Sequence, residues 1–195
     1  MKIILLLLAY SQLTIAQSDW NYLTTEDGIA IYTKEAKDSI MPFKASGLIE
    51  ANIYDVLKVL KDFSNKNKWS PKLKSVKTHQ KINDDHYIFS EYYQTPWPAT
   101  DREFLLEGQL KKLSANEYLI LAHSIDNDFK DNGHIQADVD YLNLKIKKIS
   151  ENQTNIEFEF HGDMKGWMPV WLMNLIQKKW PLRFIQGLRK YLHSI

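Results

Sequence analysis

Two charged side chains occupy positions where the sequence pattern places apolar ones. In the segment 86–93, Glu91 shares the parity of three aromatic residues, and in the segment 102–110, Arg102 shares the parity of Phe104 and two leucines. Because successive side chains of a strand point to opposite faces, both charges are expected to point inward. An uncompensated buried ion is costly. We therefore expect Glu91 and Arg102 to pair, or to meet water or a ligand; alternatively, either one lies at a strand end and reaches solvent.

Together with Tyr93 and His161, these charges could orient a substrate and exchange a proton with it. His161 shares the parity of Glu157 and Glu159, so we expect it to point outward. The chain has no cysteine, and none of its six histidines forms a pair at the four-residue spacing of metalloproteases. We therefore expect no metal and no cofactor, and we assign no catalytic residue.

The elements that must position these residues are mostly strands. Two short strands, 26–36 and 41–51, predict an opening hairpin. Segments of alternating polarity, separated by turn-rich stretches, predict an antiparallel meander over residues 86–93, 102–110, 117–124, 134–149 and 155–160. In the last of these, Phe158 and Phe160 have the inward parity. Helical periodicity begins after Asn52, a suitable N-cap, and returns after Trp167. The sequence therefore predicts an α+β fold, in which a curved antiparallel sheet wraps around a long C-terminal helix.

That C-terminal helix has a basic face and two expected weak points. No acidic residue follows Asp163, and the helix carries five cations: Lys178, Lys179, Arg183, Arg189 and Lys190. Such a face favours an anionic membrane surface, or it is a solvated face that complements the helix dipole. Pro181 and Gly187 are expected to weaken the helix, so that it can open. In the segment 102–110, Gly108 leaves a gap among the side chains expected to point inward. This gap provides room either for a ligand or for the C-terminal helix.

Composition indicates one domain with an ordinary core. The chain has 195 residues, 44% of them hydrophobic, and a formal net charge of +1. This length suits a single domain, and so small a charge gives no attraction to nucleic acid. We expect no nucleic-acid partner.

The first sixteen residues have the pattern of a secretory signal peptide. Lys2 precedes an apolar run that ends at Ala9, and the small residues Thr14 and Ala16 follow. We expect cleavage after Ala16, export to the periplasm or extracellular space, and a mature domain of residues 17–195. The alternatives are a buried N-terminal helix or an uncleaved anchor, but the apolar run is shorter than the roughly 20 residues of a spanning helix.

Three motifs occur in order along the chain: DGIAIYT near the start, PWPATDREF in the middle and GDMKGWMPVWLMN at the beginning of the last helix. With these motifs, residues 18–195 resemble a START domain, the lipid-transfer module related to the steroidogenic acute regulatory protein. The resemblance implies a helix-grip fold, in which the sheet and the C-terminal helix enclose a tunnel that holds one lipid.

The segment YYQT followed by PWPATDRE is also similar to the ceramide-transferring members of that family. This similarity implies that Gln94 contacts the ligand and that Trp97 and Trp167 lie at the tunnel mouth and touch the membrane. We place Met168 and Leu172 at the same mouth. The chain departs from those relatives by a shorter turn before Trp97 and by a glycine at position 108, where the steroidogenic member has an arginine.

The leading hypothesis is a monomeric, non-enzymatic protein that binds one lipid or sterol-like ligand and transfers it through transient contact with membranes. Its expected ligand-binding residues are Glu91, Tyr93, Gln94, Arg102, Phe104, Phe158 and Phe160. The first alternative is a helix-grip enzyme of the aromatase/cyclase type acting on a hydrophobic substrate. The second is an interaction protein whose interior is filled by its own side chains, which predicts a cavity below the roughly 300 Å³ of small-molecule sites.

Overall fold

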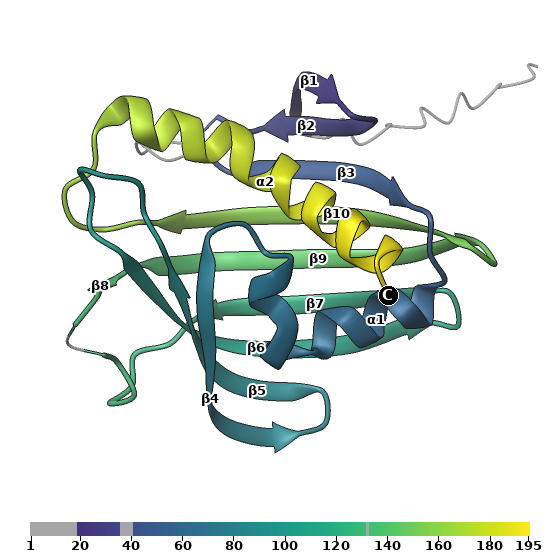
Figure 1. Ribbon diagram of the computed structural model, residues 1–195, viewed down its shortest axis with the longest axis horizontal. Coiled ribbons are helices and arrows are strands. Elements are labelled where there is room, and N and C mark those ends of the chain that lie inside the picture. The colour runs from purple at the N-terminus through teal and green to yellow at the C-terminus, as the bar shows by residue number, and fades with distance from the viewer. Residues whose placement is uncertain (1–18, 36–40, 132) are drawn as a thin grey trace, which may run out of the picture.

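The computed structural model describes residues 19–35, 41–131 and 133–195 (Figure 1). The expected signal peptide lies outside the described residues. The helical elements are α1 (Ile53–Lys61), the 3-10 helix η1 (Phe63–Lys68) and α2 (Val170–His193). The strands are β1 (Asn21–Glu26), β2 (Ile29–Thr33), β3 (Phe43–Ile49), β4 (Leu73–Asn83), β5 (His86–Tyr93), β6 (Arg102–Ser114), β7 (Glu117–Ser124), β8 (Ile135–Gln136), β9 (Asp138–Ser150) and β10 (Gln153–Asp163).

Within the described residues the strands form one ten-stranded sheet, in the order β1-β2-β3-β10-β9-β7-β6-β5-β4, with β8 paired to β6. All neighbours along the main path are antiparallel, and β8 runs parallel to the start of β6. Figure 1 shows α1 and α2 in front of the same face of the sheet. The predicted α+β architecture, a curved antiparallel sheet with a long C-terminal helix, is confirmed.

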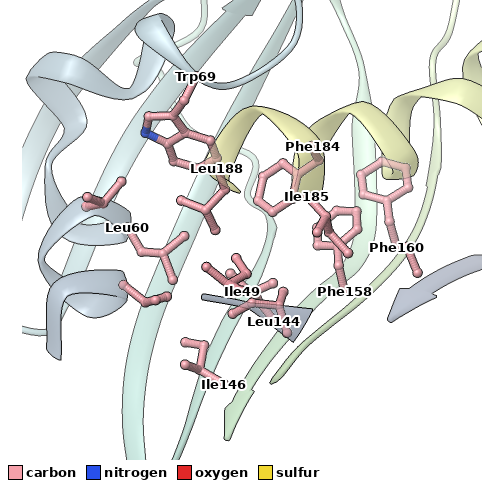
Figure 2. Close-up of a cluster of buried hydrophobic side chains, with 14 of the residues drawn as sticks. Ile49, Leu60, Trp69, Leu144, Ile146, Phe158, Phe160, Phe184, Ile185 and Leu188 are labelled. Carbon is pink, nitrogen blue, oxygen red and sulfur yellow. The ribbon is translucent and has the colours of Figure 1, made fainter. Parts of the chain in front are cut away.

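The core lies between α2 and the strands it crosses. Phe184, Ile185 and Leu188 of α2 are buried and face the sheet (Figure 2). The rings of Phe158 on β10 and Phe184 are stacked, with their centroids 4.7 Å apart. Burial of each such side chain contributes roughly 1.5–3 kcal/mol. The apolar stripe of α2 is therefore what holds the helix against the sheet.

Helix α1 begins where the sequence predicts. The side chain of Asn52 accepts a hydrogen bond from the backbone N–H of Tyr54 at 2.8 Å, as an N-cap does. The periodic apolar face of α1 is buried. The polar stretch that follows α1 forms a second helical segment, η1. Its N-cap is Asp62, whose side chain accepts a hydrogen bond from the backbone N–H of Asn65 at 3.2 Å. The sequence alone did not indicate this second helical segment.

Two strands, β1 and β4, were missed because they form the edges of the sheet. All six residues of β1 are exposed, and in β4 only Leu73 is buried. Edge strands of this kind lack the alternation of polar and apolar residues that marks a half-buried strand. The predicted strand 134–149 is divided into β8 and β9, and between them the backbone N–H of Ala137 donates to the Glu103 carbonyl at 2.9 Å.

Helix α2 continues through Pro181 and Gly187 without interruption. A Cβ atom at position 187 would lie 2.1 Å from the backbone carbonyl oxygen of Trp69, at the end of η1. Gly187 therefore allows α2 and η1 to approach closely. The sequence predicts only that Gly187 weakens the helix. The structure shows that this glycine also allows α2 to pack against the Trp69 backbone.

Replacing Gly187 with alanine is expected to lower the free energy of unfolding by about 1–3 kcal/mol, because the new methyl group overlaps the Trp69 carbonyl. In an open helix the same change would be favourable by about 1 kcal/mol. Urea denaturation measures the difference. The control is Lys190→Ala, at an exposed position of the same helix, which should change stability by no more than about 0.5 kcal/mol. A stabilised Gly187→Ala variant would contradict this account of the contact.

Candidate functional site

An apolar cavity of about 120 Å³ lies beneath the first half of α2. We call it the outer cavity. Its wall includes six residues that the sequence assigned to ligand binding, and these are Glu91, Tyr93, Gln94, Arg102, Phe104 and Phe160. Gln94 reaches it because β5 ends at Tyr93, so the alternation of the strand no longer directs this side chain.

A second cavity, of about 80 Å³, lies between η1, α2 and the sheet, and its wall also includes the exposed Lys61, Asp84 and Asp85. We call it the inner cavity. Phe158, the remaining predicted ligand-binding residue, lines this cavity. The two cavities share five lining residues, which are Glu91, Tyr93, Leu106, Leu142 and Trp180. The gap expected at Gly108 is occupied by a neighbouring ring, since a Cβ there would lie 2.8 Å from Cε1 of Phe89.

Glu91 points inward as its parity predicts, but its partner is not Arg102. One carboxylate oxygen of Glu91, which is 3% exposed, pairs with the ammonium group of Lys66 on η1, and the other accepts from the Tyr93 hydroxyl at 2.8 Å. Burial of the Tyr93 hydroxyl, together with the nearby Glu91 carboxylate, raises the pKa of Tyr93 well above its ordinary value. Lys66 was missed because it lies in a polar stretch without periodicity.

Arg102 is 1% exposed and is satisfied by backbone oxygens. Its guanidinium donates to the carbonyls of Thr100, Met164 at 3.1 Å, Lys165 at 2.8 Å and Trp167 at 3.3 Å. Burial lowers the pKa of Arg102, and the charge of Asp101 opposes this effect. These bonds tie the segment between β10 and α2 to the start of β6. The predicted pair between Glu91 and Arg102 therefore does not form, because each group has other partners.

Exposed tryptophans lie next in sequence to residues of the outer cavity's wall. Trp97 is 87% exposed and follows the wall residue Pro96, and Trp167 is 67% exposed and precedes the wall residue Met168. Trp171, in the first turn of α2, is also exposed. Met168 lines the outer cavity. Leu172 lines it too but is fully buried, so it belongs to the wall and cannot touch a membrane surface in this conformation.

The predicted basic face of α2 is partly engaged within the protein. Lys179 pairs with Glu26 at 2.9 Å, and Arg189 donates to the carbonyls of Asp27 and Leu48 at 2.7 Å each. These contacts hold the turn between β1 and β2 against α2. Among the described residues, Lys72 and Arg183 line the outer cavity without an ion pair. The mouth therefore has positive charge available.

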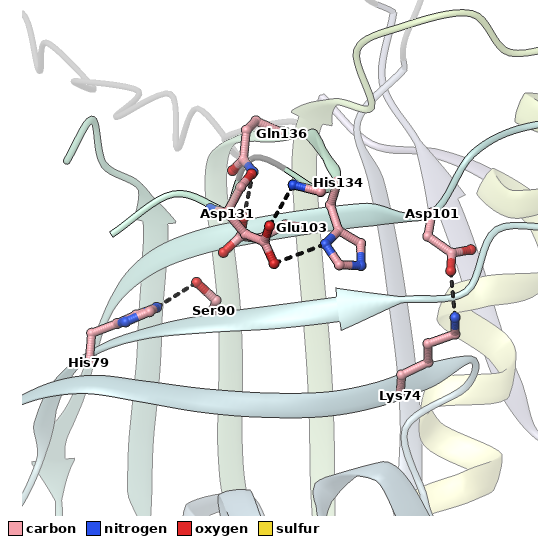
Figure 3. Close-up of polar contacts among 9 residues, drawn as sticks. Lys74, His79, Ser90, Asp101, Glu103, Asp131, His134 and Gln136 are labelled. Carbon is pink, nitrogen blue, oxygen red and sulfur yellow. Dashed lines mark hydrogen bonds and ion pairs between the residues drawn. The ribbon is translucent and has the colours of Figure 1, made fainter. Parts of the chain in front are cut away.

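A polar network on the sheet is separate from both cavities (Figure 3). The buried carboxylate of Glu103 accepts from the Asp131 backbone N–H at 2.8 Å and from the Gln136 side chain. Burial alone would raise the pKa of Glu103, but hydrogen bonds from Ser90, Gln136 and the Asp131 backbone hold the pKa below its ordinary value. The network thus attaches the segment between β7 and β8 to the sheet.

The same network contains a serine beside a histidine. Nε2 of His79 lies 2.7 Å from the Ser90 hydroxyl oxygen, a distance at which a base can activate a nucleophile. Ser90 is fully buried, however, and neither residue lines a cavity. We therefore regard the pair as structural. His161 lies 2.7 Å from Asp140 and also lines neither cavity, in agreement with its predicted outward direction.

In the part of the chain that the structure describes, no group of three or more His, Cys, Asp or Glu side chains is arranged to hold a metal ion. Within the same residues, no helix is both long enough and apolar enough to cross a membrane.

The START domain family model matches residues 6–195. The chain belongs to the START domain family. A START-family assignment agrees with the sequence resemblance and with the sheet, helix and enclosed cavities described above. An uncharacterized protein of Pseudomonas aeruginosa is 22% identical over 174 residues, which cover 88% of this chain and 85% of that protein.

Solved START-type structures share the fold. Human StAR-related lipid transfer protein 5 matches with a TM-score of 0.83 at 14% identity, over 91% of this chain and 88% of that one. A STAR-related lipid transfer protein from Xanthomonas axonopodis matches with a TM-score of 0.78 at 18% identity, over 90% and 99%. The Zhui aromatase/cyclase of a Streptomyces species matches with a TM-score of 0.57 at 8% identity, over 78% and 93%. The family and the cavities support a domain for a hydrophobic ligand.

The size of the cavities bears on the alternative that this is an interaction protein whose interior is filled by its own side chains. Each cavity is smaller than the roughly 300 Å³ of typical small-molecule sites, which by itself favours an interaction protein. The two cavities, however, share five lining residues and are therefore adjacent. A ligand larger than either cavity would occupy both only after side chains of these shared residues move.

Replacing Lys66 with methionine is expected to lower the free energy of unfolding by about 3–5 kcal/mol, because Glu91 is then left buried without its cation. Adding Glu91→Gln to that variant should restore much of the loss, as a double-mutant cycle by urea denaturation will measure. The control is Lys61→Met, which breaks the exposed pair with Asp85 and should cost less than about 1 kcal/mol. Equal losses at Lys61 and Lys66 would contradict the importance of the buried pair.

Proposed function

We propose that this START-family protein binds one lipid in the interior between α2 and the sheet, and transfers it between membranes. The observation that carries the proposal is an apolar cavity whose wall includes Glu91 and Tyr93 of a buried polar cluster, with exposed tryptophans, here called the rim, next in sequence to other residues of that wall. The solved structures of StAR-related lipid transfer proteins that share this fold support it. The N-terminal sequence supports a site of action in the periplasm or outside the cell.

The apolar wall is sufficient to hold a lipid. Burial of a chain of ~12 methylenes at ~0.8 kcal/mol each offers up to ~10 kcal/mol before the costs of ordering. Because the two cavities are small and divided, entry requires the aromatic side chains between them to rearrange or α2 to move. The difficult step is therefore opening and release, not affinity.

The rim has the chemistry of a membrane contact. Tryptophan suits the bilayer interface, because its ring is apolar and its N–H can remain in water. Trp97, Trp167 and Trp171 are exposed there, and α2 contains no acidic residue. Each cation near an anionic surface contributes roughly 1 kcal/mol. The rim would therefore place the cavity mouth against a membrane during transfer.

An enzyme of the aromatase/cyclase type is the second candidate, and two observations favour it. Lys66, Glu91 and Tyr93 form an acid–base cluster that faces the cavities, and the fold is shared with an aromatase/cyclase. Turnover of a polyketide-like substrate that is lost in Glu91→Gln would favour this candidate over the transfer protein.

Native mass spectrometry of the protein purified from its own host is expected to reveal one bound lipid per chain. A labelled lipid of the same class should move between vesicles faster in the presence of the protein than in its absence. The mass also reports whether residues 1–16 have been removed. Absence of both a co-purified lipid and transfer would refute the proposed function.

Replacing Trp97 and Trp167 with alanine is expected to slow transfer from anionic vesicles several-fold, while the affinity for the lipid changes less, because the two side chains lie at the rim. Stopped-flow transfer and equilibrium binding separate the two effects. Tyr54→Ala is a matched control, since Tyr54 is an exposed aromatic residue on α1 that lines neither cavity. A double variant that transfers at the wild-type rate would remove the rim from the mechanism.

A further inference from the structure

The wall of the outer cavity carries more positive than negative charge. Among the described residues, its charged members are four cations and one carboxylate, which are Lys72, Arg102, Lys179, Arg183 and Glu91. Glu91, Lys179 and Arg102 are compensated by the partners described above. Lys72 and Arg183 remain, and neither side chain forms an ion pair or a hydrogen bond with another described residue. The cavity wall therefore has two cations available for a ligand.

These two cations come from elements that pack against each other. Lys72 directly precedes β4, and Arg183 lies in α2. Three residues before Lys72, the ring of Trp69 contacts the ring of Phe184, the neighbour of Arg183 in the helix, at a centroid distance of 5.2 Å. Both cations are exposed and also line the cavity, as long side chains do when the stem covers apolar wall and the charge remains in water. Positive charge from two elements is thus present at one edge of the outer cavity.

The backbone of Lys72 has a conformation that favours glycine. Its φ is 62°, in the left-handed region where a Cβ atom is crowded. The Lys72 carbonyl is held there by the backbone N–H of Gln94, another residue of the cavity wall, which donates to it at 2.9 Å. The other described non-glycine residues with positive φ, Asp27 and Lys165, use their charges in ion pairs. Lys72 does not, and strained residues of this kind cluster at ligand sites.

We propose that Lys72 and Arg183 bind the anionic headgroup of the ligand, a phosphate or a carboxylate, while its apolar chain occupies the outer cavity. This inference rests on the proposed lipid-binding function and names the class of lipid, an anionic amphiphile. Arginine binds such groups through parallel N–H donors, and lysine adds a point charge. Because both cations lie at the surface, the headgroup keeps part of its water, and the large desolvation cost of a buried ion pair is avoided.

The headgroup site is tested in solution, without vesicles, by titrating the delipidated protein with decyl phosphate and with 1-decanol below their aggregation limits. The two probes share a chain and differ in charge, so the ratio of their affinities reports the headgroup alone. In Lys72→Met and in Arg183→Met, which remove the charge and keep an apolar stem, the ratio of decyl phosphate to 1-decanol affinity should fall about two- to fivefold. In the double variant it should fall about tenfold. An unchanged ratio in the double variant would overturn the inference.

The matched controls are Lys178→Met and Lys190→Met, because these residues are exposed cations of α2 that line neither cavity. They should leave the affinity ratio unchanged. Equal falls in all four single variants would indicate attraction by net charge and would overturn a defined site. An unchanged ratio combined with slower transfer from anionic vesicles in the Lys72 and Arg183 variants would assign these cations to the membrane surface, and would also overturn the inference.

Lys72→Gly separates ligand binding from folding. Glycine adopts the left-handed conformation without crowding, so the urea midpoint of this variant should not fall, whereas its affinity ratio should fall as in Lys72→Met. A lower midpoint with an unchanged ratio would show that the Lys72 side chain serves the fold, against the proposal.

The lipid that co-purifies with the protein from its host provides an independent measurement. It should carry a net negative charge, and a neutral or zwitterionic lipid would overturn the inference whichever probes bind. If neither probe binds, no lipid co-purifies and none moves between vesicles, the proposed function itself fails. That result differs from binding of both probes with an affinity ratio that no variant changes.

Discussion

The close seating of α2 on the sheet is the constraint on which the other features depend. The helix reaches the core because position 187 has no side chain, so that its backbone can lie against the Trp69 carbonyl. The same contact brings Phe184, Ile185 and Leu188 onto the sheet and places Trp180 over the aromatic strand residues. A helix held further out would widen both cavities, since residues of α2 line each of them. The size of the interior is therefore a result of helix packing.

Charge is distributed over this interior in a consistent way. The two ions that could not remain alone in an apolar region are both compensated, Glu91 by Lys66 and Arg102 by backbone carbonyls. The first arrangement places a neutral polar cluster between the cavities, and the second ties the segment before α2 to β6. Cations without ion pairs, such as Lys72 and Arg183, occur at the mouth instead. The outer cavity thus has unpaired positive charge at its wall, which suits the headgroup of an anionic amphiphile or an anionic membrane surface.

Much of this arrangement could be predicted from local pattern. Parity along β5, β6 and β10 correctly directed Glu91, Phe104 and Phe160 toward the interior, because side chains alternate along any strand. Exposure of Trp97 and Trp167 followed from their positions in proline-containing turns. Leu172 was misplaced at the mouth, since helical periodicity locates a residue on a face but does not say how deeply that face is covered. The edge strands β1 and β4 escaped detection because exposed residues carry no burial pattern.

The sequence by itself determined the fold class, the inward direction of the buried charges and the family, because periodicity, parity and motif order are local properties that survive without coordinates. Only the tertiary structure decided which side chains and carbonyls these buried residues contact. Lys66 meets Glu91 across 25 residues of chain, and the Arg102 guanidinium reaches three carbonyls more than 60 residues away. Trp180 meets four rings from three strands, β3, β5 and β10. Such contacts depend on how elements pack in three dimensions, and no spacing along the chain encodes that.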